Sequence, residues 1–481
     1  MGTHTTTSPA GRDAAAATAE LGAWVSQLDP AAVPATVVDR LGLVVLDVVG
    51  VAAVGARTAD HRALRHAWAA PAGPAPLFGT GETAPVDTSA WLNAVAMACL
   101  ELDEGNKYAK GHPAVHGFPA VLALAAERDA SGDDTAAALL AAYEVAARFG
   151  RATGLRAGAH PHGNWGVAGA AAGCARLLGL GPGACAAAID TGAGMPIAGH
   201  FDSATTGNPV RDAWLGAANT SGLAAARMAA AGVARNTGTA ALSLGSLLGE
   251  FDPRELTAGL GTRWDMTAGY FKRHASCSFT HPAADAILEL ADGRPIADVR
   301  VETHALGAGL SGTDWDNRLS AMFSTPFVVA AAALDGAVGP QTYTRHRQAD
   351  SRLRELARRV TVVAADDLTA RLPAERATRV TVRYADGDTR TAEVPNPVGD
   401  ADHRPFDRDA VTELLRGWLG DDDLLDRLVA FSTRFAASPR VGEALRGLAH
   451  VPDGTTPDGT TPQNTAPDNT APDNTAPDKE E

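Results

Sequence analysis

The most chemically distinctive stretch of the chain covers residues 101–119 and reads ELDEGNKYAKGHPAVHGFP. It places three acids, two lysines and two histidines within sixteen positions, between Ala-rich segments that carry little charge. Carboxylates near a histidine can serve as general base and general acid, because burial and mutual repulsion move their pKa values apart. A solvated loop or a metal site would use the same residue types, but no HExxH-type spacing is present. Two further histidine-containing stretches downstream favour a functional cluster.

The first of these stretches is GAHPHGNWG at 158–166. His160 and His162 are two residues apart, so on a helix they would point to different faces, and a loop is expected instead. The glycines let the backbone approach a ligand closely. A loop before a helix, with a partly exposed ring, explains His162 alone equally well.

Cationic residues stand out in two more segments. Arg211 in TTGNPVRDAW (205–214) is expected near the start of an apolar helix, where free N–H groups also suit a carboxylate. A solvated position or an ion pair with Asp212 is the commoner role of a lone arginine.

The segment YFKRHASCSFTHPAADA (270–286) holds Lys272, Arg273, His274, Cys277 and His281. Its cations could hold substrate carboxylates, and a Cys277 nucleophile is a less favoured alternative.

The composition limits the class of protein. The chain has 481 residues, 45% of them hydrophobic and 20% charged, which suits a folded protein of two or three domains. Runs of alanine predict a mostly helical protein. The net charge of −15 argues against a non-specific nucleic-acid surface and leaves room for a local basic pocket. No Walker A motif, dinucleotide fingerprint or nucleophile elbow is present, so ATP, NAD and serine-hydrolase chemistry are poorly supported.

The sequence predicts a cytoplasmic protein. The N-terminal MGTHTTTSPAGRD has no basic region leading into an apolar core, so no signal peptide is visible. The apolar run at 41–56 is short and carries Asp47, which favours a buried helix over a membrane span. No CxxC pair is present, so zinc and redox motifs are not indicated and reduced thiols are expected. The cysteines are Cys99, Cys174, Cys185 and Cys277.

Apolar spacing and turn signals predict the elements. Helices are expected at about 15–27, 35–56, 61–70, 89–102, 120–129, 134–150, 166–180, 183–195, 210–232 and 237–250. Strand-like alternation at 296–307 and 376–394, with a DGD hairpin turn, and helices at 325–335 and 349–357 indicate a smaller α/β region. The pattern is helical again at 407–448. Prolines then recur every five residues without apolar anchors, which predicts a disordered tail.

These segments, taken in order over about residues 20–450, resemble the MmgE/PrpD family, whose members include dehydratases, decarboxylases and epimerases of small polycarboxylates. The number and order of the matching segments make the resemblance specific. The segments are RLGLVVLDVVGVAAVGA, AWLNAVAMACLELDEG, GHPAVHGFPAVLALAAE, AGAHPHGNWGVAGAAAG, KRHASCSFTHPAADA and AMFSTPFVVAAAALDG.

The resemblance implies a mainly α fold, in which a large all-helical domain and a smaller α/β (α+β) lid domain enclose the active site. It also implies a homodimer. The expected boundaries are a disordered N-terminus at 1–14, helical domain at 15–272, lid at 273–404, helical domain again at 405–450 and tail at 451–481. The implied chemistry is proton abstraction next to a carboxylate of a small di- or tricarboxylate, with no metal and no other cofactor.

The resemblance also implies roles for individual residues. The expected catalytic residues are Asp103, His112, His160 and Lys272. The expected substrate-binding residues are Glu104, His162, Arg211, Arg273, His274, Cys277 and His281. Glu101 lies where the family has a further aspartate.

Five positions depart from the family pattern. Gly105 and His162 replace threonines, Arg211 replaces a lysine, Trp214 replaces a histidine and Ala275 replaces a proline. Arginine keeps the charge of lysine but excludes proton transfer at that position. These positions are expected to line the pocket, so we predict a substrate different from methylcitrate and cis-aconitate.

The leading hypothesis is a lyase that removes a proton next to a carboxylate, with elimination or decarboxylation. An isomerase or epimerase using the same proton abstraction is the nearest alternative. A catalytically inactive binding homologue on the same scaffold belongs to a different class, and a cysteine-dependent hydrolase is the least supported.

Overall fold

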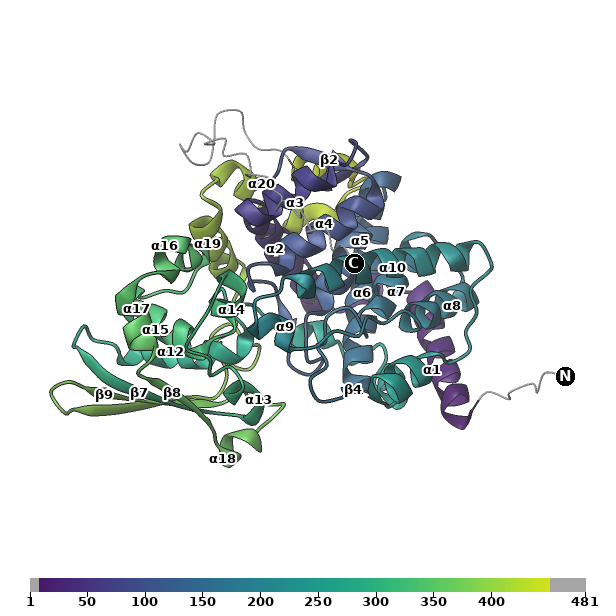
Figure 1. Cartoon of the computed structure of the whole chain (residues 1–481). Coiled ribbons are helices and arrows are strands. Elements are labelled where there is room, and N and C mark those ends of the chain that lie inside the picture. Colours follow the sequence, from purple (N-terminus) through teal and green to yellow (C-terminus); the bar gives the residue numbers. More distant parts are fainter. Residues whose placement is uncertain (1–7, 450–481) are drawn as a thin grey trace, which may run out of the picture.

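A large body of helices and a smaller α/β part lie side by side in the computed structural model (Figure 1). The structure describes residues 8–449. The predicted mainly α fold with a smaller α/β region is confirmed. The tail predicted at 451–481 and residues 1–7 lie outside the described residues.

The first helix, α1 (Pro9–Ser26), begins earlier than the start at residue 15 that the sequence predicted. Ser8 caps the helix by accepting a hydrogen bond from the Gly11 N–H at 3.1 Å. Pro9 then occupies the first turn, where a missing N–H costs nothing. The expectation of disorder up to residue 14 is therefore wrong for residues 9–14, because Ser8 and Pro9 form a local helix start signal ahead of the alanine run.

The helices of the body pack closely because small residues face one another. α6 (Gly132–Ala152) lies against α7 (Val167–Leu177), which also packs against α10 (Val210–Ala230). A Cβ atom at Gly169 of α7 would overlap α6, so glycine permits this close approach. The body also contains α2 (Ala35–Ala56), α4 (Val86–Ala98), α5 (Pro113–Arg128) and α8 (Pro182–Ala193). Within residues 8–449 no helix combines the length and apolar character needed to cross a membrane.

Helix α5 follows the charged stretch directly and contains an internal proline, Pro119. A proline inside a helix lacks the N–H that would bond the carbonyl four residues earlier, here that of Val115. Asn219 of α10 replaces this bond, because its side-chain amide donates to the Val115 carbonyl at 2.8 Å. The same side chain accepts a hydrogen bond from the Ala120 N–H at 3.0 Å. One buried amide therefore fixes α5 against α10 near the candidate site.

The α/β part is built on a four-stranded sheet of order β10-β9-β7-β8. β7 (Ile296–Thr303) pairs in parallel with β8 (Val360–Ala364), and β9 (Thr378–Tyr384) and β10 (Thr389–Val394) form the predicted hairpin. α12 (His281–Leu290) and α15 (Thr325–Asp335) cover one face of the sheet (Figure 1). The short strand β8 was not predicted from the sequence.

The chain returns to the helical body after the sheet, as predicted. α19 (Arg408–Leu419) and α20 (Asp422–Arg434) pack on α2, and α21 (Gly442–Gly447) packs on α5. Arg57 at the end of α2 ties this return in place, because it donates to the Leu419 carbonyl at 2.6 Å and to Asp421 at 2.7 Å. Segments from both ends of the described chain therefore form one body (Figure 1).

Shorter elements complete the fold. Residues 57–88, predicted as a loop with one helix, contain α3 (Ala59–Trp68) and a hairpin of β1 (Ala75–Leu77) and β2 (Glu82–Ala84). The other short strands are β3 (Gly105–Asn106), β4 (Thr153–Leu155), β5 (Gly249–Phe251) and β6 (Gly269–Tyr270). The other short helices are α9 (Asp202–Thr205), α11 (Arg254–Thr257), α13 (Ala305–Ala308), α14 (Arg318–Met322), α16 (Arg345–Gln348), α17 (Ser351–Ala357) and α18 (Asp366–Thr369). Single turns of 3₁₀ or π type are η1 (Pro30–Ala32), η2 (Ala241–Leu247), η3 (Asp265–Ala268), η4 (Ser278–Thr280), η5 (Pro340–Tyr343) and η6 (Phe435–Ala437).

Candidate active site

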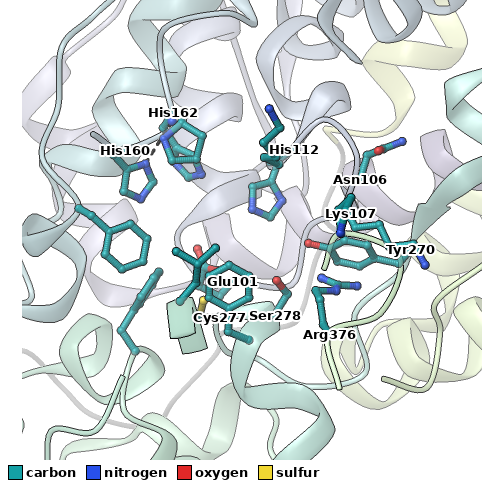
Figure 2. Close-up of a pocket in the computed structure, with 18 of the residues that line it drawn as sticks. Glu101, Asn106, Lys107, His112, His160, His162, Tyr270, Cys277, Ser278 and Arg376 are labelled. Carbon is teal, nitrogen blue, oxygen red and sulfur yellow. Dashed lines mark hydrogen bonds between the residues drawn. The ribbon is translucent and has the colours of Figure 1, made fainter. Parts of the chain in front are cut away.

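A cavity of about 370 Å³ lies between the helical body and the α/β part (Figure 2). The charged stretch, the His160 loop and the start of α10 line it from the body. Segments near Cys277, Leu306 and Arg376 line it from the α/β part. The residues expected from the sequence that line this cavity are His112, His160, His162, Arg211 and Cys277, together with Glu101.

The loop that carries the charged stretch is held in a strained shape. Glu101 and Lys110 have φ angles of 52° and 61°, in the left-handed region that non-glycine residues seldom adopt. Such residues persist only where the surrounding structure fixes them, and they cluster at functional sites. Asp47 of α2 supplies one anchor, because its carboxylate accepts a hydrogen bond from the Glu104 N–H at 3.0 Å. The acid that interrupts the apolar run of α2 therefore positions this loop.

His112 and Asp103 form a buried pair at the cavity wall. Nδ1 of His112 lies 2.9 Å from Oδ2 of Asp103 and 2.6 Å from the Glu104 carbonyl oxygen. Two acceptors at Nδ1 place the proton there, so Nε2 carries the lone pair at the ring edge that faces the cavity. Burial would raise the pKa of Asp103, but His112 and Lys272 outweigh it and hold the pKa well below its usual value. An ionised Asp103 therefore lies against Nδ1 of His112 and helps to hold the orientation of the ring.

Lys272 lies beneath this pair and does not line the cavity. Its ammonium group donates to Glu101 at 3.1 Å and lies 3.5 Å from Asp103. Burial alone would lower the pKa of Lys272, but Asp103 and Glu101 raise it above its usual value. Lys272 is thus a buried cation that holds two carboxylates, and its contacts place it as a positioning residue.

Arg211 forms the other side of the same network. Its guanidinium group is paired with Glu101 and with Asp212, the latter at 3.1 Å. Burial lowers the pKa of Arg211, but the two acids outweigh burial and raise the pKa above its usual value. The guanidinium also contacts Nε2 of His162 at 3.2 Å. The charge of Arg211 is therefore balanced within the protein.

The two histidines of the 158–166 loop form one edge of the cavity. Their ring centroids are 4.3 Å apart, and the His162 N–H donates to Nδ1 of His160 at 3.1 Å. Nδ1 of His160 is thus an acceptor, so its neutral ring carries the proton on Nε2. Burial, followed by Arg211, lowers the pKa of both rings well below the usual value. His160 is therefore a neutral N–H donor at physiological pH.

Four of the residues expected to bind substrate lie outside the cavity lining. Glu104 accepts a hydrogen bond from the Ala114 N–H at 2.7 Å in the first turn of α5. Arg273 and His274 contact Asp285 at 3.2 Å and 3.1 Å, and Nε2 of His281 lies 3.1 Å from the Ser276 carbonyl oxygen. These contacts place all four in the supporting structure around Cys277 and α5.

Other lining residues were not identified from the sequence as substrate contacts. Lys107 and Lys110 stand inside the charged stretch, and Tyr270 is the first residue of the cationic segment at 270–286, so proximity in sequence was a usable signal for these. Arg376 comes from the segment before β9 and carries no motif. Across residues 8–449, no group of three or more His, Cys, Asp and Glu side chains is arranged to hold a metal ion.

The burial of Glu104 predicts a specific pH dependence of stability. Burial raises the pKa of Glu104 from 4.5 to about 8, so the folded protein keeps a proton that the unfolded chain releases above pH 4.5. The contribution of Glu104 to stability should therefore fall as pH rises from about 4.5 to 8. The Glu104→Gln side chain is neutral and similar in shape, so the variant has no such proton to release. The difference between the Tm of the variant and the Tm of wild type should therefore become more favourable to the variant as pH rises through this range. Thermal unfolding from pH 4 to 9 measures it, with Glu127→Gln on the exposed face of α5 as control. Parallel Tm curves for wild type and Glu104→Gln would contradict the prediction.

Sequence comparisons identify the family of the chain. The profile of the MmgE/PrpD N-terminal domain matches residues 19–264, and that of the MmgE/PrpD C-terminal domain matches residues 274–417. The chain belongs to the MmgE/PrpD family, as its sequence motifs predicted.

One curated relative is named as a cis-aconitate decarboxylase, and another is named as similar to one. The chain is 26% identical to cis-aconitate decarboxylase of Aspergillus terreus over 431 residues, which cover 81% of this chain and 87% of that protein. It is 28% identical over 301 residues to the cis-aconitate decarboxylase-like protein oryM of Aspergillus oryzae, covering 58% of this chain and 62% of that protein.

Proposed function

We propose that this protein is a lyase that decarboxylates or dehydrates a small di- or tricarboxylate by proton transfer at a carbon next to a carboxylate. Membership of the MmgE/PrpD family and similarity to cis-aconitate decarboxylases support the lyase class. The observation that carries the proposal is the Asp103–His112 pair, with one imidazole nitrogen facing the cavity between the helical body and the α/β part.

His112 is the proposed proton carrier. In a dehydration, Nε2 removes a proton from the carbon next to a carboxylate, and the electron pair of that C–H bond forms the double bond as the C–O bond to the β-hydroxyl breaks. His112 passes the same proton to the departing hydroxyl, which leaves as water. In a decarboxylation of an unsaturated acid, the C–CO₂ electron pair forms a new double bond as CO₂ leaves. Protonated His112 then gives its proton to the carbon at the far end of the old double bond. Asp103 stabilises the imidazolium form in both cases, and no metal or organic cofactor is called for.

His160 has a different proposed role. Its neutral Nε2–H donates a hydrogen bond to a substrate carboxylate as negative charge spreads onto that group in the transition state. The surrounding rings of Phe201 and Phe323 and the side chain of Leu306 limit access of water, which strengthens such an interaction. We propose that these features favour decarboxylation, the reaction for which the Aspergillus terreus relative is named.

The alternatives receive less support. An isomerase would use the same His112 and remains the nearest alternative. An inactive binding homologue has no need of an oriented His112–Asp103 pair. A cysteine-dependent hydrolase needs a thiolate, whereas burial raises the pKa of Cys277 to about 12 and keeps the thiol protonated. We further propose a cytoplasmic homodimer, which rests on the family resemblance.

The test is an NMR assay in D₂O of the full chain with citraconate, malate and citramalate, alongside cis-aconitate and 2-methylcitrate, which the substitutions at the pocket predict to be poorer substrates. We expect at least one acid to lose CO₂ or water, with solvent deuterium entering the product when CO₂ is lost. Exchange with inversion and no loss of a group would identify an isomerase instead. Measurable binding of an acid without exchange or product would establish the binding homologue and overturn the proposal.

A further inference from the structure

The cavity has a second polar end that takes no part in the proton transfer proposed above. Lys107, Tyr270 and Arg376 line it. Figure 2 shows them on the opposite side of His112 from His160 and His162. A substrate that reaches His112 therefore lies between two sets of polar groups.

Arg376 is the central residue of this end. Its side chain is almost fully buried, and its guanidinium carbon lies 4.1 Å from the centre of the Tyr270 ring. One terminal nitrogen donates to Asp400 at 2.9 Å. Its Nε, although buried, has no hydrogen-bond partner among residues 8–449. A buried guanidinium N–H without a partner costs free energy, and a bound anion would satisfy it.

The charges at the two ends differ. Lys107 donates to Asp400 at 3.0 Å and to Asp402 at 2.7 Å, and the Asp402 side chain is 61% exposed, so water screens its charge. Lys107 and Arg376 therefore share one buried carboxylate, that of Asp400.

Arg211 at the other end instead faces two buried carboxylates, those of Glu101 and Asp212. Although Nε and Nη1 of Arg211 also lack hydrogen-bond partners within the described chain, Nη1 lies in ion pairs with both acids, so the cation itself is already balanced. The net charge of the buried groups therefore favours an added anion at the Arg376 end.

Tyr270 is built into the same end by a short strand pair. Tyr270 of β6 lies opposite Gly105 of β3, and a side chain at position 105 would overlap the Tyr270 hydroxyl. Figure 2 shows this hydroxyl directed toward the middle of the cavity. Gly105 is one of the positions where the sequence departs from the family pattern, so the departure makes room for a hydroxyl donor.

We propose that Arg376, with Lys107 and the Tyr270 hydroxyl, binds a second carboxylate group of the substrate and selects dicarboxylates over monocarboxylates. This inference rests on the proposed function, because it concerns the acid on which His112 acts. Arginine suits the role, since its planar group can bond Asp400 and a substrate carboxylate at the same time.

The test compares glutarate with its monoamide, glutaramate, which keeps the chain length and makes one carboxylate neutral. Calorimetric titration of the full-length wild type should give a Kd at least about tenfold lower for glutarate, since charge-assisted bonds are roughly twice as strong as neutral ones. In Arg376→Gln the ratio of the two Kd values should fall to about two or less. Asp400 keeps Lys107 as a partner in this variant, so the fold should survive.

Two more variants complete the experiment. Arg383→Gln removes an exposed arginine of β9 that pairs with Asp298, and it should keep the wild-type ratio. Tyr270→Phe keeps the ring beneath Arg376 and should weaken glutarate binding about threefold to tenfold through loss of one hydrogen bond to a charged group. This second variant tests the proposal even where Arg376→Gln is too unstable to titrate.

Several outcomes would overturn the proposal: no preference for glutarate in wild type, an unchanged ratio in Arg376→Gln, or unchanged binding in Tyr270→Phe. Turnover in the D₂O assay together with an unchanged ratio in Arg376→Gln would refute this site and leave the lyase standing. If the ratio of Kd values depends on Arg376 but no acid is turned over, the binding site stands and the proposed lyase function is refuted.

Discussion

Replacing His112 with Asn should lower kcat by about 100- to 10,000-fold, the range expected when a positioned proton carrier is lost. The Asn side-chain amide can still donate to Asp103, which His112 contacts at 2.9 Å, but nothing replaces Nε2. The fold should therefore survive, and the Kd of an unreactive acid such as tricarballylate should change by less than about threefold. Steady-state kinetics, calorimetric titration and thermal unfolding measure these three effects.

A matched control for this variant is His61→Gln. His61 is also buried, and its Nε2 lies 2.9 Å from the Leu92 carbonyl oxygen, away from the cavity lining. Its replacement should cost stability and leave kcat within about twofold. A His112→Asn enzyme that keeps more than a tenth of the wild-type kcat would show that another group carries the proton.

Replacing Lys272 with Met should destabilise the protein by about 3–5 kcal/mol, the loss expected when one partner of a buried ion pair is removed. Methionine has a similar length, so the packing is kept while Glu101 and Asp103 lose the cation that they share. Activity should fall as well, because Asp103 no longer orients His112 in the same way. Urea unfolding followed by circular dichroism measures the loss of stability.

A second substitution separates charge from packing in this variant. Adding Glu101→Gln to Lys272→Met removes one of the two stranded charges, so the double variant should be more stable than Lys272→Met alone. Arg227→Met is the surface control, because Arg227 and Asp87 form an exposed pair at 2.9 Å, and its loss should cost about 0–1 kcal/mol. A loss in Lys272→Met no larger than in Arg227→Met would contradict the role of Lys272 as a buried positioning cation.

Local patterns in the sequence predicted most of the helices. α15 (Thr325–Asp335) has the predicted bounds, and the hairpin of β9 and β10 follows its DGD signal. These elements are specified by residues near one another in the chain, namely apolar spacing and turn residues. The short strands β3 and β6 had no such signal, because each exists only through pairing with the other.

The charged stretch at 101–119 shows what its composition could predict and what it could not. Its composition alone indicated chemistry, and the order of motifs around it identified the family. Composition did not separate the roles of neighbouring acids: Asp103 contacts His112, whereas Glu104 caps the first turn of α5. In a loop the side-chain directions follow no period, so only contacts made by the folded chain assign them.

Sequence alone thus determined the helical class and the family, because each depends on local pattern or on the order of motifs along the chain. Tertiary structure decided which groups face the substrate. Lys272, Arg273 and His274 are consecutive, yet Lys272 lies under the His112–Asp103 pair and the other two contact Asp285. Arg376, far away in the chain, reaches the cavity because the α/β part folds over it. These placements arise from long-range packing and buried charge pairing, which no local segment encodes.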